Sequence, residues 1–381
     1  MSAGQSFIAA YVLIFIGYCL ILLISTRVRP RAFAKVPSAR PLSLGIVVPA
    51  YNELRSTGSI AAAIGIARDL AVPIVVVDDG STDGSDVLLE DLCREDGARL
   101  LRHRLNRGKA AALNTGIAAL GTDLVLTIDA DTRLEAADLN DALIRFGDSR
   151  TGAVALTIDG SGTSFLTRAQ FTEYRYILNF ERAALARLGI VFTVPGAASV
   201  WRRDALTEIG GFRSRTCAED TDATISLSLA GWRIEVAPNP ARTDCPASIR
   251  KLLRQRARWI WGTIQAAGFA LVNLAQQRSL RHVGPGVAFI AATTLNMTGF
   301  LFSIVFLTRL FFGEAGWSDL LAGGVLLNLA AFRLWLAYPA HQPAVRRLFV
   351  DLARVCVMQA VNTAAFWLGL MTGRAARISW H

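Results

Sequence analysis

The stretch DLVLTIDADTRLE, residues 123–135, places three acidic residues after an apolar run. Residues 124–128 (LVLTI) have the form of a buried strand, because a short apolar run bounded by polar residues is typical of a strand inside a sheet. Asp129, Asp131 and Glu135 follow this run. Carboxylates at the end of a buried strand lose solvation free energy unless positive charge meets them. The stretch therefore predicts a sheet whose edge holds something cationic.

Three earlier segments repeat this form: LSLGIVVPAYNE (42–53), VPIVVVDDGSTD (72–83) and ARLLRHRLNRG (98–108). Helix-like stretches separate the strands, at 56–70, 84–96 and 108–120. Alternating strands and helices predict a parallel sheet covered on both faces, and ligands of such sheets bind at the carboxyl ends of the strands. The polar residues at those ends should line one crevice: Asn52, Glu53, Asp78, Asp79, Asn106, Lys109, Asp129 and Asp131.

The composition of the 381-residue chain indicates contact with a membrane. The apolar share is 52% and the charged share is 18%, below the usual value of about a quarter. The net charge of +10 includes Arg residues beside apolar segments, as in RVRPR (27–31). Anionic headgroups explain that placement better than nucleic acid does, so we expect a lipid bilayer and no nucleic acid as partners.

Cysteine and histidine are too dispersed along the chain to predict a zinc site or a disulfide framework. The five Cys residues include no CxxC pair, and the four His residues are equally scattered. Any metal in this protein should therefore be a hard cation with oxygen ligands.

Phe7 to Ser25 is an apolar, uncharged stretch that is long enough to span a bilayer. A signal peptide is the alternative, but it would carry positive charge before the apolar stretch. Here residues 1–6 have no charge, and the basic segment 27–35 follows instead. We therefore expect an uncleaved anchor with a cytoplasmic basic flank, an outward N-terminus and a cytosolic domain after it.

After residue 245 the chain becomes amphipathic and then apolar. Residues 247–274 carry Leu253, Ala257 and Ile260 at helical spacing and Arg residues on another face, which is typical of a helix in a membrane interface. Three apolar stretches that could span follow, at 286–308, 317–338 and 349–371. The number of spans and the side of the C-terminus stay open.

Each candidate site residue also has an ordinary structural explanation. Asp129 and Asp131 could cap a turn, or they could hold a divalent cation that holds a diphosphate. Asp78 and Asp79 could belong to a strand-to-helix turn, or they could accept hydrogen bonds from a nucleobase or a ribose. Lys109 follows a glycine at a predicted helix start, a position that suits phosphate.

Two further clusters lie on predicted helices. Glu219 and Asp220 begin a helical run, either because acids stabilise helix N-termini or because one of them is a general base. Gln255, Arg258 and Trp259 share one helical face. That face could belong to an interfacial helix, or it could form an aromatic platform for a sugar ring.

Six motifs stand in the order of one known family: VVPAYNE, VDDGSTD, NRGKAAALNTG, DAD, AED and QRARW. Over residues 43–262 the chain resembles the processive family-2 glycosyltransferases, which include cellulose, chitin and hyaluronan synthases, NodC-type synthases and bacterial poly-N-acetylglucosamine synthases. The resemblance implies an α/β GT-A (Rossmann-like) cytosolic glycosyltransferase domain flanked by transmembrane helices. The implied parts are an N-terminal transmembrane anchor, the GT-A domain, an amphipathic interface helix with QxxRW and C-terminal transmembrane helices, at 1–30, 38–245, 246–280 and 281–375.

The resemblance also implies roles for the residues that bind the donor. Asp78 and Asp79 would contact the uracil and ribose of a UDP-sugar, and Lys109 would lie along the donor pocket. Asp129 and Asp131 would bind the diphosphate, Asp131 through Mg2+ or Mn2+.

The later motifs would complete the site that the resemblance implies. Asp220, with Glu219 beside it, would be the general base of a single inverting displacement. Gln255, Arg258 and Trp259 would close the donor site and stack the acceptor sugar.

The implied protein is a multi-pass enzyme of the plasma membrane (bacterial inner membrane) with a cytoplasmic catalytic domain. It would transfer a sugar from a UDP-sugar to the end of a growing β-linked polysaccharide or oligosaccharide. The GAAS segment at 196–199, where many relatives carry Gly-Ser or Gly-Thr, leaves the glycan acceptor open. The few candidate spans would fit a short product or a homo-oligomeric pore.

Two alternatives differ in the fate of the sugar. A non-processive enzyme would add one sugar to a lipid acceptor, but QRARW favours the polymer because many lipid-directed relatives lack QxxRW. A non-catalytic partner built on a degenerate domain is the other alternative, and the intact Asp129, Asp131 and Asp220 count against it. The sequence predicts neither which UDP-sugar is used nor the linkage.

Overall fold

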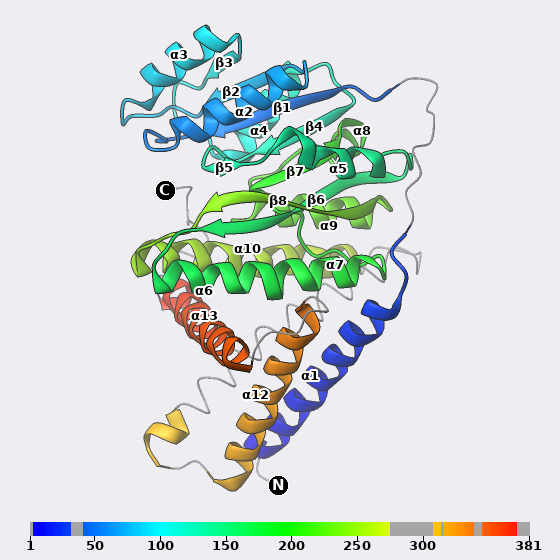
Figure 1. Ribbon diagram of the computed structural model, residues 1–381, viewed down its shortest axis with the longest axis vertical. Coiled ribbons are helices and arrows are strands. Elements are labelled where there is room, and N and C mark those ends of the chain that lie inside the picture. The colour runs from blue at the N-terminus through cyan, green and yellow to red at the C-terminus, as the bar shows by residue number, and fades with distance from the viewer. Residues whose placement is uncertain (1–2, 32–40, 275–307, 314–315, 339–344, 372–381) are drawn as a thin grey trace.

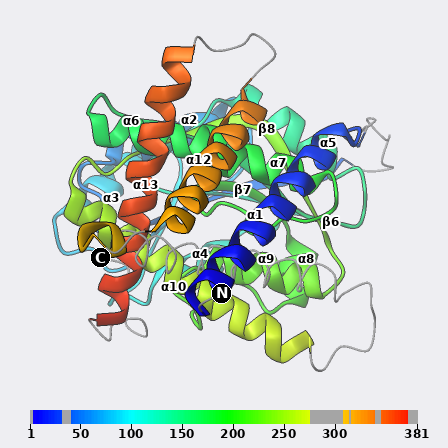
Figure 2. The same ribbon diagram turned by 90° about the horizontal axis from the view of Figure 1, so that it is seen from below.

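The computed structural model describes residues 3–31, 41–274, 308–313, 316–338 and 345–371. In Figure 1 these residues form three layers, with a sheet and its covering helices at the top. The middle layer contains α6 (Phe165–Glu173), α7 (Phe180–Ala186) and α10 (Ile249–Leu274). The bottom layer contains α1 (Ala3–Arg27), α12 (Trp317–Ala337) and α13 (Val345–Met371), which Figure 2 shows from below.

In the described part of the chain, one sheet has eight strands in the order β3-β2-β1-β4-β7-β6-β8-β5. The strands are β1 (Leu44–Ala50), β2 (Ile74–Asp78), β3 (Arg99–Arg102), β4 (Leu124–Ile128), β5 (Thr132–Arg133), β6 (Thr151–Ser161), β7 (Ala198–Arg202) and β8 (Arg233–Asp244). β3, β2, β1 and β4 pair in parallel, which confirms the prediction for this half. The helices α2 (Thr57–Asp69), α3 (Ser85–Asp96) and α4 (Lys109–Ala119) also lie where they were expected.

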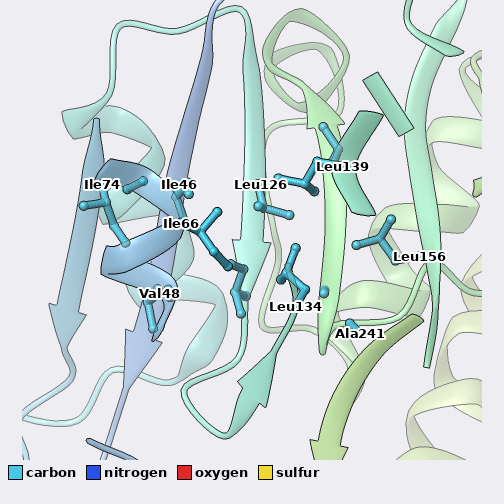
Figure 3. Packing of buried hydrophobic residues seen from close by; sticks show 14 of the residues in the cluster. Ile46, Val48, Ile66, Ile74, Leu126, Leu134, Leu139, Leu156 and Ala241 are labelled. Carbon is cyan, nitrogen blue, oxygen red and sulfur yellow. The ribbon is translucent and has the colours of Figure 1, made fainter. Parts of the chain in front are cut away.

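β1, β2 and β4 are largely apolar because helices cover both faces of this half of the sheet. Every residue of β1, β2 and β4 is buried. Figure 3 shows one side of this core, where Ile46 and Leu126 of the sheet belong to one cluster with Ile66 of α2. Because β1 and β4 are neighbours, with Val47 opposite Thr127, the residues that follow these strands emerge at the same edge.

The second half of the sheet is mixed and departs from the parallel pattern. β7 is antiparallel to β4 and β6, whereas β8 is parallel to β6. β8 contains Pro238 and Pro240, and proline inside a segment argues against a strand because it cannot donate a ladder hydrogen bond. The structure accommodates both at a register shift opposite Leu156 and Thr157. Sequence periodicity therefore does not mark this strand.

The helices of the second half fall into three groups: short connections beside the sheet, one helix at the strand ends, and a pair joined by a π-helical segment. α5 (Asn140–Arg145) and α8 (Arg203–Glu208) are short connections beside the sheet, whereas α9 (Glu219–Leu229) starts at the strand ends. α6 and α7 are joined without a break by a π-helical segment, Tyr174–Asn179. A 3-10 turn, Ala136–Leu139, precedes α5.

Three of the stretches predicted to be membrane helices are helical in the structure, as α1, α12 and α13. Within the described residues, one helix, Arg346–Met371, is long and apolar enough to cross a bilayer, and the apolar segment Val12–Arg27 is shorter. The predicted span at 286–308 lies almost entirely outside the described residues. The multi-pass arrangement, the interfacial position of α10 and the predicted domain limits stay predictions.

Candidate active site

A cavity of about 700 Å³ lies where the carboxyl ends of β1 and β4 face α9 and α10. The sheet contributes Asn52, Glu53, Asp129 and Asp131, and the start of α4 contributes Lys109. These five residues confirm the crevice expected from the sequence. We call Glu53, Asp129, Asp131 and Lys109 the acidic edge.

The expectation was wrong for Asp78, Asp79 and Asn106, which do not line the cavity. The Asp79 carboxylate is fully buried and accepts hydrogen bonds from the Arg107 N–H at 3.0 Å and the Gly108 N–H at 2.7 Å. His103 Nδ1 lies 2.6 Å from the same carboxylate. Asp79 therefore shapes the loop that precedes α4.

The other two residues also serve local structure. Asp78, at the end of β2, accepts a hydrogen bond from the Ser81 N–H at 3.0 Å. Asn106 Oδ1 accepts one from the Gly108 N–H, also at 3.0 Å. Contacts of Asp78 and Asp79 with a nucleotide stay a prediction.

Lys109 links the acidic edge to α9. Its Nζ lies 2.6 Å from Asp129 Oδ1 and 3.3 Å from Glu219 Oε1. Burial alone would lower the pKa of Lys109, but the attraction of these carboxylates outweighs burial and raises that pKa. The ammonium therefore stays protonated beside the strand ends.

The three carboxylates of the acidic edge carry more negative charge than the ammonium of Lys109 compensates. Burial raises the pKa of Asp129 to about 6 in spite of Lys109, and it raises the pKa of Glu53 to about 7. Burial also raises the pKa of Asp131, whose Oδ1 accepts hydrogen bonds from Thr132 and Thr243 at 3.2 and 3.4 Å. A bound cation would stabilise the ionised form of these carboxylates.

The donor set suits a cation that is shared with a ligand. Among the residues that the structure describes, no three His, Cys, Asp or Glu side chains form a ready-made metal cage. Mg2+ is usually held by one or two carboxylates together with substrate phosphates rather than by a full protein cage. Asp131, with Asp129 near it in the same cavity, fits this requirement.

Asp220 lines the same cavity from the start of α9. Its Oδ2 accepts a hydrogen bond from the Gly196 N–H at 2.8 Å, and its Oδ1 accepts one from the Thr221 N–H at 2.7 Å. Burial and the neighbouring Glu219 raise its pKa, although Lys109 opposes them. A Cβ at position 196 would lie 3.0 Å from Lys109 Nζ and 3.1 Å from Asp220 Oδ2, which explains a glycine there.

One face of α10 closes the cavity, and it carries the three residues whose spacing predicts a shared face. Gln255, Arg258, Trp259 and Thr263 all line it. The Gln255 Oε1 atom is buried and has no hydrogen-bond partner among the described residues. Arg258 makes no ion pair with any carboxylate of the described residues. Both side chains can therefore serve a ligand.

The π-helical segment supplies a wall that the sequence did not predict. Tyr174, Leu178, Asn179 and Arg182 line the cavity from this segment and from α7. Asn179 fixes the segment to the sheet, because its amide donates to the Ile158 C=O at 2.7 Å and accepts from the Ile158 N–H at 3.1 Å. We call this segment together with the cavity face of α10 the helical wall.

The sequence gives no local signal for these residues. Burial lowers the pKa of Arg182 to about 10, while the negative charge of Asp220 opposes this effect. An Arg in FERAALARL gives no sign of burial, and a π turn shifts the facing residues away from the ordinary helical spacing.

Comparisons with known proteins agree with this geometry. Residues 45–210 match the family model described as glycosyl transferase family 2. An N-acetylglucosaminyltransferase of Mesorhizobium japonicum is 33% identical over 60% of this chain and 58% of its own length. A β-monoglucosyldiacylglycerol synthase of Nostoc is 28% identical, covering 62% and 52%, and a poly-β-1,6-N-acetyl-D-glucosamine synthase of Staphylococcus epidermidis is 24% identical, covering 58% and 54%.

A solved structure resembles the whole fold. The mannosyltransferase PcManGT from Pyrobaculum calidifontis, in complex with GDP-Man and Mn2+, gives a TM-score of 0.66 at 20% identity over 97% of this chain and 99% of its own. This likeness supports a GT-A-like mixed α/β fold. The chain spans 58% of the length of the Mesorhizobium relative that it matches.

Proposed function

The chain carries a family-2 glycosyltransferase domain, and from this premise we propose that it transfers a sugar, with inversion, from a UDP-sugar to a glycan acceptor at a membrane. The observation that carries the proposal is one cavity that joins the acidic edge, the buried Asp220 and the face of α10. In this proposal the acidic edge would bind the diphosphate, Asp220 would be the base and the face of α10 would bind the sugar.

Asp220 would act as the general base. The acceptor hydroxyl oxygen attacks the anomeric carbon, the bond from that carbon to the UDP oxygen breaks, and the hydroxyl proton passes to an Asp220 oxygen. The Gly196 and Thr221 N–H groups hold the carboxylate in place. Its raised pKa makes it a stronger proton acceptor than an exposed aspartate.

The acidic edge would bind the donor diphosphate. Asp131, with Asp129, would hold Mg2+ or Mn2+, which would supply positive charge for the departing UDP. Lys109 holds Asp129 and Glu219 in place through its ion pairs. Arg258, which has no carboxylate partner among the described residues, would add charge to the diphosphate.

The acceptor would be the end of a β-linked polysaccharide or oligosaccharide, which stacks on Trp259 of the helical wall. The Staphylococcus relative, a poly-β-1,6-N-acetyl-D-glucosamine synthase, supports this assignment. The Nostoc relative, a β-monoglucosyldiacylglycerol synthase, favours a lipid acceptor as the second candidate. A multi-pass location in the plasma membrane, with the site on the cytoplasmic side, is part of the proposal. The candidate span Arg346–Met371 supports membrane attachment.

Purified protein in detergent with labelled UDP-sugars and Mg2+ or Mn2+ tests this function. UDP-N-acetylglucosamine is the first probe, because the rhizobial relatives are named for that sugar. We expect UDP release and a ladder of labelled products. One lipid-linked sugar would establish the second candidate, and the absence of UDP release with every donor, alone and in pairs, would refute the proposal.

A further inference from the structure

Arg256 lies between the cavity residues of QRARW but points away from the cavity into the protein. It is 3% exposed and does not line the cavity, unlike Gln255 and Arg258. Its Nη2 lies 2.7 Å from Glu173 Oε2, and Glu173 is 7% exposed. The two atoms make an ion pair without the alignment of a hydrogen bond.

The Arg256 guanidinium also backs the aromatic part of the helical wall. Its carbon Cζ lies 4.6 Å from the centre of the Trp259 ring and 5.5 Å from that of Tyr174. The two rings are 6.3 Å apart and both line the cavity. One buried cation that lies outside the cavity therefore contacts two aromatic rings that line it. A desolvated cation–π contact is stronger than an exposed one.

The bottom layer supports this arrangement through α13. Asn362 Nδ2 donates a hydrogen bond to Glu173 Oε1 at 3.0 Å, so both carboxylate oxygens are engaged. α13 packs against both α6 and α10, as Figures 1 and 2 show. The chain of contacts runs from α13 through Glu173 and Arg256 to the rings that face the cavity.

We propose that Glu173 and Arg256 are positioning residues that hold Tyr174 and Trp259 at the angle at which they stack on the acceptor sugar. The proposal rests on the proposed function and extends it from Trp259 to three further residues. A buried ion pair adds little stability over an apolar pair of the same size, so its presence here needs another reason. Fixing the rings provides that reason, because stacking depends on ring orientation.

Two variants separate positioning from a purely structural role. Arg256→Lys keeps the charge beside Glu173 but loses the planar group that lies over the rings. The double variant Glu173→Met with Arg256→Met removes both charges and leaves no unpaired one. Arg254→Met is the matched control, because Arg254 is exposed on the same helix and lies outside the cavity.

The main readout is calorimetric binding of N-acetylchitooligosaccharides without donor, beside binding of UDP with Mg2+ and the Tm of each variant. We expect both Arg256 variants to bind the oligosaccharide about tenfold more weakly, because neither keeps the planar guanidinium that orients the two rings. UDP binding should be unchanged, the Tm of Arg256→Lys should match the wild type, and Arg254→Met should behave as wild type.

Unchanged oligosaccharide affinity in Arg256→Lys would overturn the proposal, even if the double variant does not fold. So would an equal loss of UDP and oligosaccharide affinity, or a wild type that binds no oligosaccharide. These outcomes differ from a failure of the proposed function, which is an absence of UDP release and is measured separately.

Discussion

The acidic edge and the helical wall face each other across one cavity, but they are held in place in different ways. Asp129 and Asp131 follow directly from a buried strand, and their position depends on the sheet. Trp259 depends instead on Arg256 beneath it and on Glu173 from another helix. The edge therefore depends on the strand that precedes it, whereas the wall depends on contacts between helices.

This difference assigns different sensitivities to the two regions. Substitution at the edge should change charge and donor binding while leaving the fold intact, because these side chains lie at strand ends. Substitution behind the wall should change acceptor binding through the rings. Kinetic constants for donor and acceptor, measured separately, can therefore test the comparison.

The largest effect is expected between the two regions, at Asp220. Asp220→Asn removes the proton acceptor and should lower kcat by roughly 10²- to 10⁴-fold while UDP binding stays near the wild-type value. Initial rates and UDP calorimetry measure both quantities. Asp204→Asn, at an exposed position in the first turn of α8, is the control. Normal turnover in Asp220→Asn would refute the assignment of the base.

Asp131→Ala should have the next largest effect, and only on the donor side. Loss of a group that merely supports a metal ligand weakens metal affinity by up to about 100-fold. Loss of the ligand Asp131 itself should weaken metal affinity by at least that factor. UDP binding by the variant should then no longer respond to Mg2+ or Mn2+, and wild-type protein treated with EDTA should behave in the same way. Metal dependence equal to the wild type would remove Asp131 from the metal site.

The two regions also differ in how much the sequence predicted. The parallel strands and the edge were predictable, because a continuous apolar run followed by acids has few other structures. The same reasoning failed for Asp78 and Asp79, since a strand-end position does not reveal that the Asp79 carboxylate is used by backbone N–H groups. Strand position predicts where a residue lies but not which partners it has.

The helical wall was predictable only on its α10 side. The spacing of Gln255, Arg258 and Trp259 places them on one face, which the structure brings to the cavity. Glu173 and Tyr174 lie more than eighty residues earlier, at the start of a π-helical segment that 3.6-residue spacing does not represent. Contacts of this kind depend on the packed structure and leave no local pattern.

Gly196 offers a smaller test at the base. Gly196→Ala places a Cβ 3.0 Å from Lys109 Nζ and 3.1 Å from Asp220 Oδ2, so both side chains must shift. We expect kcat to fall roughly tenfold, less than the ~10² that a misplacement of about 1 Å can cost. Gly121→Ala, where a Cβ meets no atom within 4 Å, is the control. Equal rates in the two variants would show that the base tolerates displacement.

The smallest expected effect is a shift of the pH profile. The base acts only when ionised, so kcat/KM should fall as the pH drops through the pKa of Asp220, which burial and Glu219 raise above the usual aspartate range. Glu219→Gln removes a negative charge beside Asp220, and this removal favours the ionised form of Asp220. The pKa of Asp220 should therefore fall, and the acid limb of the profile should move to lower pH. A pH–rate profile with saturating donor measures the shift. A limb that stays in place or moves to higher pH would mean that a group other than Asp220 limits the rate at low pH.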